Sequence, residues 1–122
     1  MASRPRIIIG NLEPILALGL NRVLSEDGLE VLGQESDAAR IVSEAGRLEP
    51  DAVVLDLNHG EAASVARRVR RASPSTKVVL WARDETVMEI LDPSSDSARL
   101  VAVAGPQDLS NELTRTRPRV KE

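Results

Sequence analysis

The sequence contains no cysteine, no phenylalanine and no tyrosine, and it has one tryptophan and one histidine. Without cysteine the chain can form neither a disulfide framework nor a thiolate site, and a lone histidine cannot build a histidine-based metal site. The scarcity of aromatic rings excludes the stacking platform with which proteins bind single-stranded nucleic acids. Leu, Ile, Val and Ala must therefore build the core.

The sequence also lacks an excess of basic charge and any long apolar run. Its formal net charge is −3, which argues against DNA binding by the body of the domain, since phosphate recognition needs a basic face. A run of three isoleucines near the N-terminus is too short for a signal peptide or a membrane span. We expect a cytoplasmic protein that makes no membrane contact.

Five short hydrophobic runs are typical of strands buried in a parallel sheet, in a chain of 122 residues that is long enough for one core. The expected strands are Arg6–Gly10, Leu29–Gly33, Ala52–Leu57, Lys77–Ala82 and Ala98–Ala104.

Apolar residues at helical spacing follow each of these runs. The expected helices run from Pro14 to Gly28, from the candidate caps Ser36 and Asp37 to Pro50, and over Glu61–Ala72, Glu85–Leu91 and Pro106–Thr114. A strand followed by a helix five times predicts an α/β fold, (βα)5 and doubly wound, with a five-stranded parallel sheet and helices on both faces.

Functional residues of an open parallel sheet gather beyond the carboxyl ends of its strands. The residues at these positions are Asn11, Leu12 and Glu13, then Asp56 to His59, Trp81 to Arg83, and Val103 to Gly105. Gly10 has no second or third glycine in register for a dinucleotide loop, and no phosphate loop or nucleophile elbow occurs. We expect no catalytic residue, no cofactor and no bound metal, so the chain is not expected to be an enzyme.

Four stretches resemble the receiver domain of bacterial response regulators, of the kind joined to a C-terminal helix-turn-helix DNA-binding domain. They are RIIIGNLEPILALGL, EVLGQESDAARIVSEAGRLEPDAVVLDL, KVVLWARDE and VAVAGPQDL, and the likeness covers about residues 5 to 115. It rests on the strand–helix order, on an aspartate that ends the third strand, and on the placement of Pro14 and Gly19. The resemblance implies a flavodoxin-like receiver fold and a role in two-component signal transduction.

In that family two acids after the first strand and a backbone carbonyl two residues beyond the phospho-acceptor hold a magnesium ion. The resemblance places the acceptor at Asp56, the acids at Asn11 and Leu12, and the carbonyl at Asn58. The less regular members of the family imply Glu13, next to this pair, as a candidate partial substitute for a missing acid. Only the acceptor is kept.

The family also has a hydroxyl side chain after the fourth strand and a lysine after the fifth. These positions align with Trp81 and with Ala102 or Val103. Without the metal acids and the lysine, the charge of an incoming phosphoryl group is not offset. We therefore expect Asp56 to be an inactive carboxylate bonded to nearby backbone or water, and Trp81 either to fill the vacated space or to line a pocket.

Three functions are compatible with this degenerate site. The one that we favour is a phosphorylation-independent signalling and dimerisation module of a transcriptional regulator. The alternative is a regulatory domain that binds a small-molecule effector in the vacated pocket around Asn11, Asp56, Trp81 and Ala102. A conventional receiver phosphorylated on Asp56 is the third, which the substitutions argue against.

The expected partners are a second copy of the chain and a small-molecule or protein effector. Leu109 and Leu113 lie four apart on the last expected helix and, with the first helix, are the candidate dimer interface. Residues 1–115 are expected to form the receiver-like domain. Residues 116–122, which are basic and contain a proline, are expected to be a linker to a DNA-binding domain, so that DNA is bound only through that domain.

Overall fold

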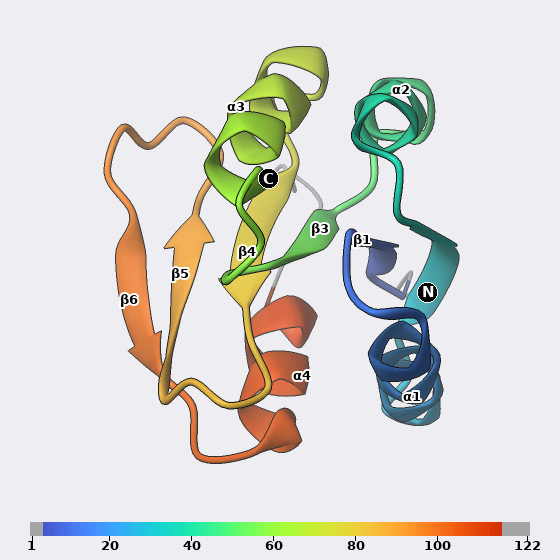
Figure 1. The fold of residues 1–122 in the computed structure, drawn as a ribbon, viewed down its shortest axis with the longest axis vertical. Helices are drawn as coiled ribbons and strands as arrows, with labels where there is room; N and C mark the ends of the chain where they lie inside the picture. Colours follow the sequence, from blue (N-terminus) through green and yellow to red (C-terminus); the bar gives the residue numbers. More distant parts are fainter. Residues whose placement is uncertain (1–3, 116–122) are drawn as a thin grey trace.

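The computed structural model describes residues 4–115, which form one mixed sheet with helices on both faces (Figure 1). The strand order is β2-β1-β3-β4-β5-β6. In chain order the elements are β1 (Arg6–Gly10), α1 (Pro14–Glu26), β2 (Glu30–Glu35), α2 (Ala38–Leu48), β3 (Ala52–Asp56), α3 (Ala62–Ala72), β4 (Lys77–Trp81), β5 (Val87–Leu91), β6 (Arg99–Ala102) and α4 (Pro106–Thr114).

The first four strands form the parallel sheet that the hydrophobic runs predict. β1 pairs with β2 on one side and with β3 on the other, and β4 continues the parallel order beyond β3. Successive residues of a strand face opposite sides, so Ile7 and Ile9 enter the core under α1 and α4, while Ile8 enters the core under α2 and α3. This half of the fold agrees with the prediction.

The second half differs from the prediction at residues 85–91, where the expected helix is a strand. β5 runs antiparallel to β4, and β6 pairs antiparallel with β5, so the described residues form a six-stranded mixed sheet and four helices instead of (βα)5. Met88 and Ile90 are completely buried, while Val87, which points to the opposite face of β5, is 39% exposed. This alternation has the period of two that a strand requires. The helix prediction was wrong because a short apolar run does not distinguish the two structures.

α4 packs under the antiparallel half of the sheet and buries both of its leucines. Leu109 and Leu113 are 0% exposed and belong to the core that contains Met88 and Ile90. These two side chains therefore have no surface to offer a second copy, and the prediction that they line a dimer interface has to be corrected.

A buried ionic network holds β6 and α4 against the beginning of β4. The Lys77 ammonium donates to Glu112 Oε2 at 2.8 Å, and an Arg99 nitrogen donates to the same oxygen at 2.8 Å. Arg99 also donates to both carboxylate oxygens of Asp92, at 2.6 and 3.0 Å. The side chains of Lys77 and Glu112 are 8% and 3% exposed, so they are charged partners inside the protein.

No helix among residues 4–115 has both the length and the apolar character to cross a membrane.

Candidate functional site

The carboxyl ends of β1, β3 and β4 bring Asn11, Asp56 and Trp81 to one edge of the sheet. Asp56 and Trp81 are partners in the parallel ladder, so their side chains leave the sheet on the same face. The Leu57 N–H donates to the Trp81 carbonyl at 3.0 Å, which joins the two strand ends. These three predicted site residues therefore meet, as the rule for parallel sheets requires.

Asn11 acts here as a backbone clamp. Its φ of 45° lies in the left-handed region, which asparagine tolerates better than most residues. Its N–H donates to the Glu35 carbonyl at 2.8 Å, and its Oδ1 accepts the N–H of Asp56 at 2.9 Å. The side-chain oxygen that could face a cation is thus used to hold β3 beside β1.

Asp56 organises the loop that follows it. Its Oδ1 accepts the N–H of Asn58 at 3.0 Å, and its carbonyl accepts the N–H of His59 at 3.1 Å. The side chain is half-buried at the mouth of the site. The carboxylate is therefore held by the backbone of its own loop.

The two residues after Asn11 do not join Asp56. Leu12 is 5% exposed and packs in the core, while the exposed Glu13 precedes α1 and lines a groove that does not include Asp56. Residues 4–115 contain no group of three His, Cys, Asp or Glu side chains close enough to hold a metal ion.

The lysine position is displaced by the insertion of β5. Ala102 and the following Val103 belong to the edge strand and its exit, two strand spacings from β4, or about 10 Å. In a sheet where the fifth parallel strand adjoins β4 this distance would be about 5 Å. Lys77, the one lysine among the described residues, lies at the opposite end of β4 in the ionic network.

Gly10 serves packing and not ligand approach. A Cβ at this position would lie 2.9 Å from methyl carbons of Ile41 and Leu55, so glycine lets α2 pack closely on the sheet.

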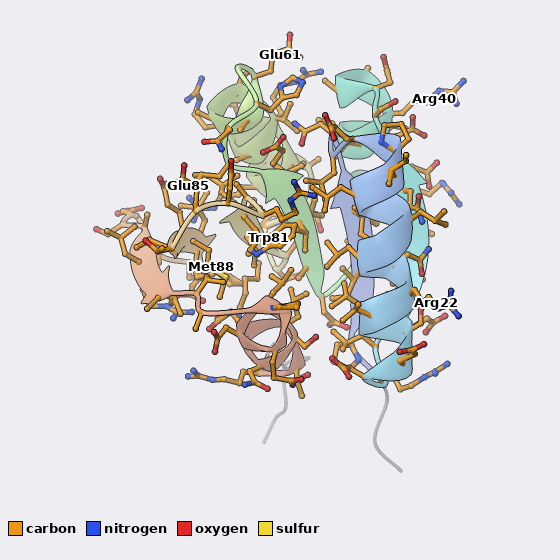
Figure 2. The ribbon with its side chains drawn as sticks, turned by 60° about the horizontal axis from the view of Figure 1, so that its bottom comes forward. Arg22, Arg40, Glu61, Trp81, Glu85 and Met88 are labelled. Carbon is orange, nitrogen blue, oxygen red and sulfur yellow. The ribbon has the colours of Figure 1, made fainter. Side chains whose placement is uncertain are left out.

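A groove of about 560 Å³ opens beside the candidate site on the face that α1 and α4 cover. Its lining includes Trp81, which is 5% exposed and whose Nε1 has no hydrogen-bond partner among the described residues. Figure 2 shows Trp81 between α1 and the loop that carries Glu85. This groove was not predicted from the sequence; Gly19, in the interior of α1, leaves open space on its wall.

No protein-family model and no curated protein matches this chain. Among solved structures, the signal receiver domain of NarL from Mycobacterium tuberculosis, described as a response regulator, is similar to it. The TM-score is 0.60 and the sequence identity 26%, and the match covers 69% of this chain and 70% of that chain. The chain has the fold of a signal receiver domain.

This receiver fold agrees with the resemblance found in the sequence. The agreement covers the α/β architecture and the mostly parallel sheet, while β5 adds an antiparallel strand to the five that were expected. The fold supports a role in receiving a signal.

Proposed function

We propose that this chain is a receiver-like signalling and dimerisation module that works without phosphorylation of Asp56. The observation that carries the proposal is that the residues at the positions of the phosphorylation site make structural contacts. The Asn11 side-chain oxygen accepts the Asp56 N–H, Trp81 stands where the family has a hydroxyl side chain, and β5 separates the lysine position from β4.

Phosphorylation of an aspartate requires positive charge around the incoming phosphoryl oxygens. A magnesium ion prefers several oxygen ligands, usually including carboxylates. Here the two positions that are acidic in the family hold Asn11 and Leu12, so Asp56 lacks the carboxylates that would complete a magnesium site. The transition state would therefore lose several kcal/mol of stabilisation.

Treatment of the full chain with acetyl phosphate and magnesium is expected to leave its mass unchanged, because no metal site or lysine compensates the charge at Asp56. Intact-mass spectrometry measures the result, with a conventional receiver as the positive control. Stoichiometric addition of one phosphoryl group that Asp56→Asn abolishes would contradict the proposal.

The proposed assembly is a symmetric homodimer, the commonest closed arrangement of two copies. With Leu109 and Leu113 in the core, support for an α1 surface comes from Ile15 and Leu18, which are 85% and 66% exposed on neighbouring positions of that helix. Exposed aliphatic side chains three residues apart form one apolar strip.

Light scattering is expected to give a dimer mass at tens of micromolar protein, and Leu18→Glu is expected to return the chain to a monomer, because it places two like charges across a two-fold axis. Ser64→Glu, at an exposed position of α3 on the other face of the sheet, is the control for one added negative charge. A constant mass of 13.2 kDa up to several hundred micromolar would refute the dimer.

In this proposal the module belongs to a transcriptional regulator, and DNA is bound by a further domain. The predicted linker, residues 116–122, lies outside the residues that the structure describes. The alternative function is the binding of a small-molecule effector. Its site would be the groove beside α1, which is lined by Trp81 but not by Asn11, Asp56 or Ala102.

A further inference from the structure

The groove between α1 and α4 has the size and lining of a small-molecule site. Its volume of about 560 Å³ falls within the range of about 300 to 1,000 Å³ that is usual for ligand pockets. Its walls are Leu16, Leu20 and Val23 of α1 and Val103 on the opposite side, with Trp81 beneath. A ligand with an apolar body would therefore bury its surface against aliphatic side chains and one indole.

Gly19 keeps the groove open. It is in the interior of α1, where glycine destabilises a helix relative to other residues, and its φ is not positive. A Cβ at Gly19 would meet nothing within 4 Å, so close packing does not require glycine there. The consequence of this glycine is an empty space on the groove wall, between Leu16 and Val23.

The charged side chains at the rim of the groove favour one sign of charge on the ligand. Glu13, Asp84 and Glu85 line it against a single cation, Arg83, which forms no ion pair within residues 4–115. The net charge of these four side chains is negative, so a positively charged group is favoured.

The beginning of α4, which also borders the groove, does not reverse this preference. A helix N-terminus attracts anions through its free N–H groups. Here the Asp108 carboxylate already accepts the N–H groups of Ala104 and Gly105, at 2.6 and 3.2 Å. Asp108 thus places a negative charge in the first turn of α4, which opposes the binding of an anion at this end of the helix.

We infer that this groove binds a small apolar cation, of the class of arylalkylamines, in which a protonated amino group is attached to an aromatic ring through a methylene carbon. The inference goes beyond the proposed function, since a ligand here contacts neither Asp56 nor Asn11 and its binding is independent of phosphorylation.

A matched pair of probes tests the inference on the full chain: 1-naphthylmethylamine, a cation at neutral pH, and 1-naphthaleneacetate, an anion with the same ring. Calorimetry is expected to give the cation a dissociation constant at least about tenfold lower than the anion. Because the chain has one tryptophan, its indole N–H gives a single NMR signal, which is expected to shift on binding.

Gly19→Leu is expected to fill the groove and weaken cation binding by about tenfold or more, while the melting temperature does not fall. Gly33→Leu adds the same side chain to open space in β2, outside the groove, and is the matched control. The double variant Asp84→Asn/Glu85→Gln is expected to remove the preference for the cation.

Three results would overturn the inference. These are no cation binding at millimolar concentration, anion binding that is equal or tighter, and unchanged binding to Gly19→Leu. The acetyl phosphate assay is unaffected by each of them, so a failure of this site is distinguishable from a failure of the proposed function.

Discussion

Glu112→Ala is expected to lower the free energy of unfolding by about 3–5 kcal/mol, because it leaves the buried Lys77 ammonium without its carboxylate. Both side chains of the Lys77–Glu112 pair are buried, whereas both side chains of the Arg22–Glu26 pair on α1 are exposed. Urea denaturation followed by circular dichroism measures the change. A loss below about 1 kcal/mol would show that Lys77 finds water or another partner.

Two further variants separate lost charge pairing from lost packing. Lys77→Met/Glu112→Leu replaces the pair by apolar side chains and is expected to recover most of the stability, since removal of both charges leaves neither unpaired. Glu26→Ala breaks an exposed pair with Arg22 and is expected to cost less than about 1 kcal/mol. A double variant as unstable as Glu112→Ala would assign the loss to packing.

The same ionic network makes the free energy of unfolding depend on pH. Burial raises the pKa of Glu112, but hydrogen bonds from Arg99 and Lys77 outweigh it and hold the pKa below its ordinary value of 4.5. The hydrogen bond from Arg99 lowers the pKa of Asp92 below 3.8, against the smaller effect of burial. A carboxyl whose folded pKa is depressed stabilises the fold above its unfolded pKa, and this stability is lost as the pH falls through the folded value.

The free energy of unfolding is therefore expected to decline as the pH falls through about 4.5, where the glutamate of the unfolded chain becomes protonated while Glu112 in the fold is still ionised. Denaturation curves of the wild type and Glu112→Gln between neutral and acid pH measure this, and the variant is expected to show a shallower decline.

Ile90→Ala is expected to cost about 2–5 kcal/mol, because Ile90 is completely buried between the sheet and α4. Val87→Ala, on the same strand but on its opposite and partly exposed face, is expected to cost less than about 1 kcal/mol. Denaturation of both variants gives the comparison.

This pair of variants also distinguishes a strand from a helix. Residues three apart lie on opposite faces of a strand but on the same face of a helix. Equal losses for Val87→Ala and Ile90→Ala would therefore favour the helix that the local pattern of residues 85–91 predicts and would contradict β5.

The candidate site was partly predictable because one rule of parallel sheets places several side chains at once. Asn11, Asp56 and Trp81 each follow a strand of the regular half, and they meet at one edge as expected. Ala102 and Val103 were expected beside them but lie two strands from β4, because their distance depends on β5, which local sequence did not identify.

The sequence by itself determined β1 to β4 and the helices between them, because each hydrophobic run and each helical period is strong enough to specify its element locally. Only the tertiary structure decided the rest. Val87–Leu91 is a strand because β4 offers it an unpaired edge and α4 buries Met88 and Ile90, and both effects arise from residues distant in the chain. Leu109 and Leu113 are core residues for the same reason, since a leucine contacts the core or a partner according to what packs against it.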